Sequence, residues 1–227
     1  MNARQEKKLS VDDTDRWLGP HQGQDVLATG MPLAEAGAAM ILLHGRGSCA
    51  ENILELAGEI TLPGFACLAP QALGGSWYPH TFLAPLDANE PCLSSALVAV
   101  GDVLATITQA GIPPERVCLF GVSQGACLAL EFAARHARRY GGVAALSGGL
   151  IGPDDTPRDY PGTLAGTPVF LGCSDVDPHI PATRVRHTAE VLRRLGADVA
   201  LRFYPHMRHT VNADETAFVR EMVRGIA

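Results

Sequence analysis

A glycine-flanked serine at residues 121–125 (Gly-Val-Ser-Gln-Gly) constrains the fold of this chain more than any other feature. The apolar residues 117–120 before it predict a buried strand, and the alanine- and leucine-rich residues 124–138 after it predict a helix. A serine on so sharp a turn has a strained backbone, and the glycines let strand and helix approach closely. The helix also directs free backbone N–H groups towards Ser123. The segment therefore predicts an activated serine at one end of a sheet, a context that a chance match in a chain with 24 glycines would lack.

The rest of the chain alternates short apolar runs with helical periodicity. Strands are expected at residues 39–43, 65–68, 117–120, 143–146, 167–172 and 199–204, and helices at residues 53–60, 93–107, 124–138, 181–195 and 213–226. Asn212 and Glu215 predict a capping box on the last helix, and residues 25–28 are expected to add an antiparallel edge strand. Strands separated by helices imply right-handed crossovers. We therefore expect an α/β fold with a mostly parallel, doubly wound sheet and helices on both faces.

Length and composition favour one domain over residues 1–227. The chain is 47% hydrophobic and 19% charged, which suits a single α/β domain with a large core. Residues 1–20 are expected to form a loosely ordered N-terminal segment. Two long irregular segments, residues 71–91 and 148–166, are expected to be functional or covering elements. The second is too short for a large cap domain, so we expect an open site.

Charge and cysteine usage exclude several classes of partner. The net charge is −6 and no run of Lys or Arg exceeds two residues, as at Lys7-Lys8, so no nucleic-acid partner is expected. No apolar run is expected to reach transmembrane length, and the charged residues 1–10 lack the core of a signal peptide, so no stable membrane insertion is expected. Six scattered cysteines without a CxxC pair predict reduced thiols in a cytoplasmic protein, with no metal and no cofactor. A homodimer remains open.

A serine hydroxyl attacks only when a base takes its proton and an acid orients that base. In sheets of this kind, catalytic groups follow the carboxyl ends of strands. Asp175 and Asp177 follow one late strand, and we favour Asp177 because it lies nearer the next helix. His206 and His209 follow the last strand, and we favour His209 because it lies nearer the final helix and could reach Ser123. The order Ser, Asp, His along the chain is the one found in folds whose nucleophilic serine lies on the turn between a strand and a helix.

The negative charge that develops on a reacting carbonyl oxygen needs two backbone donors. One is expected from the amide after the serine, Gln124 N–H. The other is expected from the loop after an earlier strand, where residues 44–47 read His-Gly-Arg-Gly. The glycines allow this backbone to turn inward, so Arg46 N–H is the candidate.

Aromatic side chains in the first long irregular segment are candidates for a substrate pocket. Trp77, Tyr78 and Phe82 supply apolar surface near the expected catalytic edge of the sheet. The equally weighted alternative is that Trp77 and Tyr78 only hold this segment against the core.

Four ordered motifs resemble those of one family of enzymes. They lie at residues 42–47, 121–125, 177–181 and 207–210. They are similar to the motifs of the small phospholipase/carboxylesterase family, which includes the acyl-protein thioesterases and has the α/β-hydrolase fold. The resemblance implies ester or thioester hydrolysis by Ser123, Asp177 and His209, with oxyanion amides at Arg46 and Gln124.

The chain departs from this family at one position. Arg46 stands where acyl-protein thioesterases commonly carry an apolar residue, which argues against a protein-thioester substrate. Dienelactone hydrolases share the fold but carry a cysteine where this chain has Ser123. We therefore expect a serine carboxylesterase for small or medium-chain esters. The alternatives are a lysophospholipase or acyl-thioesterase, and a non-catalytic binding protein, which would have no need of an activated serine.

Overall fold

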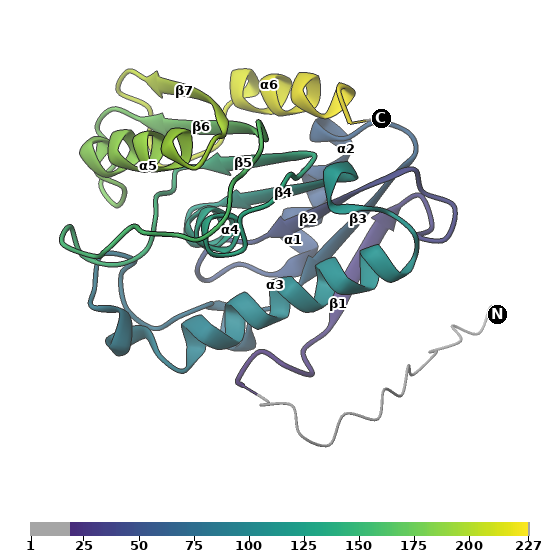
Figure 1. The fold of residues 1–227 in the computed structure, drawn as a ribbon, viewed down its shortest axis with the longest axis horizontal. Helices are drawn as coiled ribbons and strands as arrows, with labels where there is room; N and C mark the ends of the chain where they lie inside the picture. The colour runs from purple at the N-terminus through teal and green to yellow at the C-terminus, as the bar shows by residue number, and fades with distance from the viewer. Residues whose placement is uncertain (1–18, 227) are drawn as a thin grey trace.

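The computed structural model describes residues 19–226, and its central element is one seven-stranded sheet (Figure 1). The strands are β1 Val26–Gly30, β2 Ala38–Leu43, β3 Phe65–Pro70, β4 Val117–Val122, β5 Gly142–Leu146, β6 Pro168–Ser174 and β7 Asp198–Tyr204. The helices are α1 Ala50–Glu55, α2 Ala57–Ile60, α3 Cys92–Gln109, α4 Gln124–Arg135, α5 Ala182–Arg194 and α6 Ala213–Arg224, with short 3₁₀ turns η1 Leu73–Gly75, η2 Leu86–Asn89 and η3 Pro114–Arg116. The segment expected to be loosely ordered lies, up to residue 18, outside the described residues.

The strands pair in the order β1-β3-β2-β4-β5-β6-β7. Strand β1 pairs with β3 antiparallel, and all other neighbours are parallel. Leu43 of β2 lies beside Gly121, and Leu146 of β5 lies beside Val122. The carboxyl ends of the central strands therefore meet at one edge of the sheet, directly before Ser123. The expected mostly parallel sheet and its antiparallel edge strand are confirmed.

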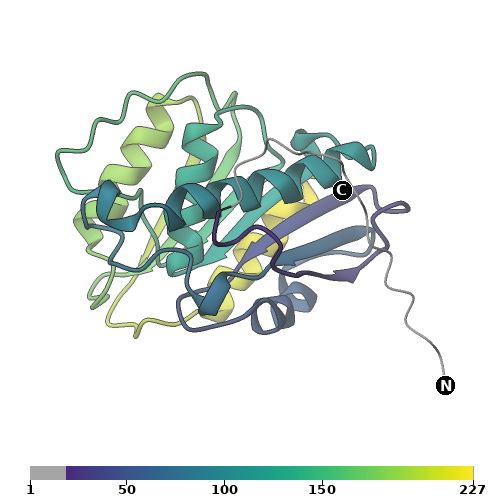
Figure 2. The same ribbon diagram turned by 90° about the horizontal axis from the view of Figure 1, so that it is seen from below.

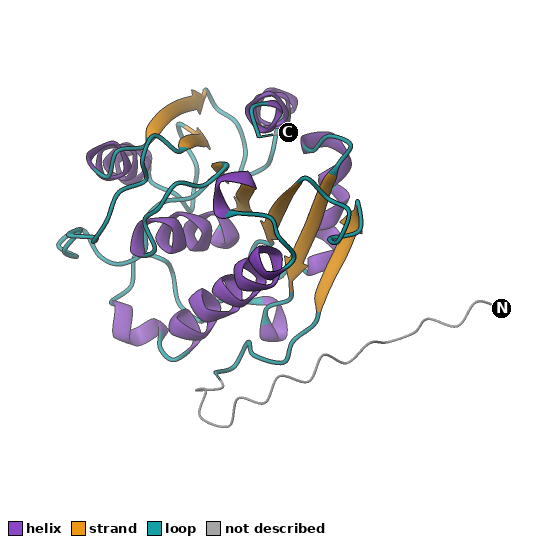
Figure 3. Cartoon of the chain, turned by 45° about the vertical axis from the view of Figure 1, so that its right-hand side comes forward, coloured by secondary structure: helices purple, strands orange, loops and turns teal. Residues whose placement is uncertain are grey.

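Helices cover both faces of the sheet (Figures 2 and 3). Side chains of α3, α4 and α5 form one apolar core with alternate residues of the strands, such as Ala39, Ile41 and Leu43 of β2. Side chains of α1, α2 and α6 form a second core with the intervening strand residues, including Met40 and Leu42. Because both faces are buried, a central strand such as β2 is apolar at every position, which is why it reads as a continuous run.

Helix α3 contradicts the expectation that no apolar run reaches transmembrane length. With 18 residues and a mean hydropathy of 1.4, it is long and apolar enough to cross a membrane by length and composition. The structure places its apolar stripe against the core, where Leu93, Val100 and Ile107 are fully buried. Core packing therefore accounts for the apolar character of this helix.

Two expected helices have different bounds in the structure. The helix expected at residues 53–60 is divided at Leu56, where a hydrogen bond from Leu56 N to Ile53 O replaces the regular α-helical pattern. The helix expected to reach residue 138 ends at Arg135, because Ala137 makes a bridge with Gly162 of the long segment beyond β5. The capping box of Asn212 and Glu215 is confirmed.

Two glycines allow β2, β4 and α4 to meet at the serine turn. A Cβ atom on Gly121 would overlap the backbone carbonyl of Gly125, and one on Gly125 would overlap the carbonyl of Leu43. The close approach expected from the sequence is therefore real, and it leaves no room for any side chain at these two positions.

Replacement of Gly125 by alanine is expected to lower the free energy of unfolding by about 1–3 kcal/mol, or to prevent folding, because the methyl group would overpack the contact with β2. Gly58 is the matched control, since an added Cβ there meets no atom within 4 Å. Gly58→Ala should leave stability unchanged or raise it by about 0.5–1 kcal/mol. Urea unfolding checks both variants, and equal effects would contradict the close-packing argument.

Candidate active site

Ser123 lies on the strained turn between β4 and α4. Its φ of 56° and ψ of −117° are unfavourable for a residue with a side chain. Backbone hydrogen bonds fix this geometry, because Ser123 N donates to Leu146 O at 2.9 Å and Ser123 O accepts from Cys127 N at 3.0 Å. Neighbouring strand and helix thus hold the hydroxyl above the edge of the sheet.

His209 and Asp177 complete a hydrogen-bonded chain to this serine. His209 Nε2 lies 2.9 Å from Ser123 Oγ, and His209 Nδ1 lies 2.7 Å from Asp177 Oδ2. A carboxylate can only accept, so Nδ1 carries the imidazole proton and Nε2 is free to accept the serine proton. The Asp177 side chain is 0% exposed, whereas the His209 side chain is 24% exposed. The base therefore reaches solvent while its orienting acid does not.

The environment keeps Asp177 ionised. Burial acts to raise its pKa, but hydrogen bonds from His209 and from the amides of His179 and Ile180 outweigh burial and lower the pKa below its usual value. The charged carboxylate can thus stabilise the imidazolium that forms when His209 takes a proton.

The second acid and the second histidine in these loops have a different role. Asp175 Oδ1 accepts a hydrogen bond from His206 N at 2.8 Å, and both residues are exposed. His206 has a φ of 53°, so this bond stabilises a tight turn after β7. The structure brings Asp177 and His209, not Asp175 and His206, to Ser123.

Two backbone amides beside the serine have no acceptor within residues 19–226. Gln124 is the first residue of α4, so its N–H has no partner within the helix. Arg46 N–H makes no hydrogen bond in the described part of the chain. The loop that carries Arg46 touches the serine turn, since a Cβ on Gly45 would lie 3.5 Å from Ser123 Cβ. The two amides predicted from the sequence are thus available for an oxyanion.

The side chains of Gln124 and Trp77 hold the segment of residues 71–91 over the site, a role that the sequence analysis considered for Trp77 but not for Gln124. The buried Gln124 side chain accepts from Trp77 N at 2.9 Å and donates to Tyr78 O at 2.8 Å. Trp77 Nε1 donates to His44 O at 2.9 Å. A polar residue directly after the serine, at the start of a mostly apolar helix, was the signal that could have indicated this role for Gln124.

The other long segment is anchored by Glu131 of α4. This buried carboxylate accepts from Ile151 N at 3.0 Å and from Tyr160 Oη at 3.2 Å, and it pairs with Arg135 at 2.7 Å and Arg158 at 3.6 Å. One acidic residue on an otherwise apolar helix thus ties the segment of residues 148–166 to the core.

A pocket of about 330 Å³ opens above Ser123 and His209. Tyr78 and Phe82, two of the three aromatic residues singled out in the sequence, line it. Trp77 is fully buried and lies outside the lining, with its ring between those of His21 and His44 at centroid distances of 5.5 and 5.0 Å. Trp77 therefore packs against the core, whereas Tyr78, although buried, and Phe82 also border the pocket; their role in substrate binding stays a prediction.

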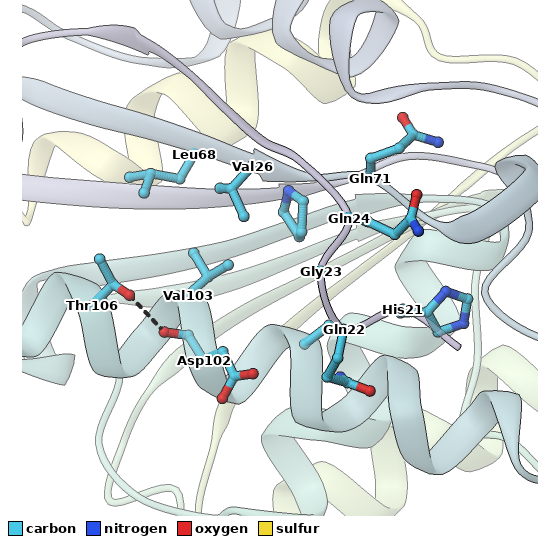
Figure 4. Close-up of a pocket in the computed structure, with 12 residues that line it drawn as sticks. His21, Gln22, Gly23, Gln24, Val26, Leu68, Gln71, Asp102, Val103 and Thr106 are labelled. Atoms are coloured by element: carbon cyan, nitrogen blue, oxygen red, sulfur yellow. Dashed lines mark hydrogen bonds between the residues drawn. The ribbon is translucent and has the colours of Figure 1, made fainter. Parts of the chain in front are cut away.

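A second pocket, of about 470 Å³, lies between β1, β3 and α3 (Figure 4). His21, Gln22 and Gln71 line it, but Ser123, Asp177 and His209 do not. Within residues 19–226, no group of three or more His, Cys, Asp or Glu side chains is arranged to hold a metal ion. The pocket above Ser123 combines a nucleophile with a base, which the pocket beside β1 does not.

A central-strand serine, an acid after β6 and a histidine after β7 are the arrangement of the α/β-hydrolase fold. Residues 26–226 match the family model of the phospholipase/carboxylesterases, and the chain belongs to this family.

Relatives in sequence and structure agree with this membership. A phospholipase/carboxylesterase structure from Dyadobacter fermentans is 41% identical, with a TM-score of 0.86 over 89% of this chain and 97% of that chain. An acyl-protein thioesterase 1 from Gibberella zeae is 33% identical over 50% of this chain and 49% of its own length. The Arabidopsis thaliana carboxylesterase SOBER1 is 26% identical over 66% of this chain and 67% of its own length. The chain thus spans about half the length of the curated thioesterases it matches.

Two buried histidines fix the start of the segment over the site. His44 Nε2 accepts from Ala72 N, and His21 Nδ1 accepts from Leu73 N, each at 3.1 Å. Their other ring nitrogens bond Gly45 O at 2.8 Å and Trp77 O at 2.9 Å. Burial lowers the pKa of both histidines below 6.5. Both are therefore neutral, and a second ring proton would break the bonds to the amides.

The lowered pKa values predict a loss of stability in acid. The unfolded chain binds protons at these histidines more tightly than the folded chain does. The contribution of the neutral histidines to the free energy of unfolding is therefore complete above the unfolded pKa of about 6.5, and it is lost as pH falls through the folded pKa. We expect His21→Gln to lose less stability than the wild type between neutral and mildly acidic pH. The difference cannot exceed about 1.4 kcal/mol per pH unit for one proton.

Urea unfolding of both proteins at several pH values measures this difference. Glu215, whose pKa burial raises to about 7, acts in the opposite direction and cancels in the comparison. Identical pH slopes for wild type and variant would show that His21 does not contribute.

Proposed function

We propose that this protein is a serine carboxylesterase that hydrolyses small or medium-chain esters through an acyl-enzyme. The hydrogen-bonded chain from Asp177 through His209 to Ser123 is the observation that carries the proposal. The two free amides beside the serine and membership of the phospholipase/carboxylesterase family support it.

The geometry suits a two-step reaction. Ser123 Oγ attacks the ester carbonyl while His209 Nε2 takes its proton, and Asp177 stabilises the resulting imidazolium. The amides of Arg46 and Gln124 donate to the oxygen of the tetrahedral intermediate. His209 then protonates the departing alcohol, which leaves the acyl group on Ser123. Water, deprotonated by His209, releases the acid and restores the serine.

The size and lining of the pocket support small substrates. Its volume of about 330 Å³ is near the lower end of the range for ligand sites, roughly 300–1,000 Å³. Tyr78, Phe82 and Ile180 provide apolar surface for a short acyl or alcohol group. A long acyl chain would extend beyond this surface into solvent, so the part outside the pocket would add no binding free energy.

Two other functions were considered. A thioester follows the same chemistry at the same serine, and four relatives are named acyl-protein thioesterase 1, so a thioesterase is the second candidate. A binding protein would gain nothing from the strained backbone of Ser123, which costs stability, or from a carboxylate and an imidazole aligned on its hydroxyl. We therefore favour catalysis over binding.

The cysteines support a cytoplasmic location, which we also propose. All six are free thiols.

Burial raises the pKa of Cys118, Cys127 and Cys173 to about 12, so these thiols stay protonated. Cys127, one turn along α4 from the serine, is therefore no competing nucleophile.

Ser123→Ala is expected to abolish fluorophosphonate labelling and nearly all hydrolysis of p-nitrophenyl butyrate. The substitution removes the attacking oxygen and little volume, so the fold should survive. Any remaining activity should not exceed the contribution of the oxyanion amides and substrate binding, about 10³–10⁴-fold over water. A wild-type protein that is not labelled and hydrolyses no ester from acetate to laurate would refute the catalytic proposal.

Asp177→Asn is expected to lower kcat by about 10⁴-fold, because an amide in place of the carboxylate favours the wrong tautomer of His209. Asp175→Asn is the matched control in the same loop, and its effect on kcat should be far smaller because Asp175 contacts only the turn after β7. Steady-state kinetics of both variants test the assignment. The opposite ranking would assign the acid to Asp175.

A further inference from the structure

Arg46 brings a permanent positive charge to the pocket above Ser123. It is exposed and lines this pocket together with Tyr78 and Thr81. None of the described residues that line the pocket is an aspartate or glutamate. Asp177 lies behind His209 with a fully buried side chain, so its charge serves the histidine. The entrance to the site is therefore electrostatically suited to a negatively charged group.

The Arg46 guanidinium is fixed by neutral partners. Nη1 donates to Ser76 Oγ and to Pro79 O, each at 2.9 Å, and Nη2 donates to His80 O at 2.5 Å. Its central carbon lies 5.9 Å from the centroid of the Tyr78 ring. These contacts orient the group without neutralising it. The Nε–H and one Nη2–H have no acceptor in the described part of the chain, which leaves two donors for a ligand.

Holding the loop does not by itself require an arginine. The same loop is already fixed to the serine turn by Gln124, which bonds Trp77 N and Tyr78 O, and to strand β2 by Trp77 Nε1. The acceptors of Arg46 are a hydroxyl and two carbonyls, and a neutral donor would satisfy them. A preoriented, unneutralised guanidinium beside the oxyanion amides is better explained by recognition of an anion.

We propose that Arg46 is a specificity-determining residue that binds a carboxylate of the substrate, so that the preferred substrates are small esters with a free carboxylate a few bonds from the ester carbonyl. This inference rests on the proposed esterase function. Arg46 supplies both its backbone amide to the oxyanion and its side chain to the substrate. The two contacts are therefore close in space, which limits the distance between the carboxylate and the ester carbonyl.

The carboxylate can belong to the acyl or the alcohol part of the ester, and paired substrates distinguish the two. Monomethyl succinate carries it on the acyl side and is compared with methyl pentanoate. The acetate ester of 3-hydroxypropanoate carries it on the alcohol side and is compared with butyl acetate. The quantity measured is the ratio of kcat/KM for each anionic ester to that of its neutral partner, because damage to the oxyanion loop affects both and divides out.

For at least one pair, Arg46→Gln is expected to lower this ratio by about 10- to 100-fold, since a hydrogen bond to a charged group is worth roughly 1.5–3 kcal/mol. Arg46→Lys should give an intermediate ratio, because it keeps the charge but loses the planar fork. Arg220→Gln is the matched control. Arg220 is half-buried and donates to two backbone carbonyls at 3.1 and 3.3 Å, and it does not line the pocket, so the ratio should keep its wild-type value.

A second measurement does not depend on turnover. Free succinate should protect Ser123 of the wild type from fluorophosphonate labelling and should protect Arg46→Lys less. Unchanged ratios in both Arg46 variants, with neutral esters still hydrolysed, would overturn the carboxylate site and leave the esterase proposal intact. Absence of both labelling and hydrolysis in the wild type would overturn both.

Discussion

The structure depends on the contact between three backbones at the serine turn. Gly121 and Gly125 let α4 approach β4 and β2 more closely than any side chain would allow. This contact forces Ser123 into its strained conformation and leaves the first amide of α4 without a partner. The same approach brings the loop after β2 against the serine. One steric requirement thus positions the proposed nucleophile and both proposed oxyanion donors.

The parts of the site that were predicted from the sequence are those linked to strand ends. Because parallel strands end at one edge of a sheet, the order of Ser123, Asp177 and His209 along the chain was enough to place them together. The choice between Asp175 and Asp177 also depended on local position, since Asp177 lies closer to the helix that follows. The structure accounts for this choice, because the amides of His179 and Ile180, in the loop just before this helix, bind the Asp177 carboxylate.

The parts that were not predicted depend on partners far away in the sequence. Glu131 is one acidic residue on an apolar helix, and nothing nearby indicates that Ile151 and Tyr160 bind it. His21 reaches the backbone of Leu73 and Trp77 across more than fifty residues. Trp77 and Tyr78 are neighbours with equal aromatic character, and only the path of the loop decides which of them faces the pocket. Tertiary hydrogen bonds of this kind leave no periodic signal.

The position of each group in the sheet decides which part of the site depends on the edge strand. Ser123 follows the central strand β4, whereas His209 follows β7, an edge strand that pairs only with β6, and precedes the last helix. The geometry of the serine turn depends on β2, β4, β5 and α4, so it does not need β7. The hydrogen-bonded chain from Asp177 through His209 to Ser123 does need it, because His209 is in reach only while β7 is paired with β6. Loss of the edge strand would therefore separate the proposed base from a serine turn that is otherwise intact.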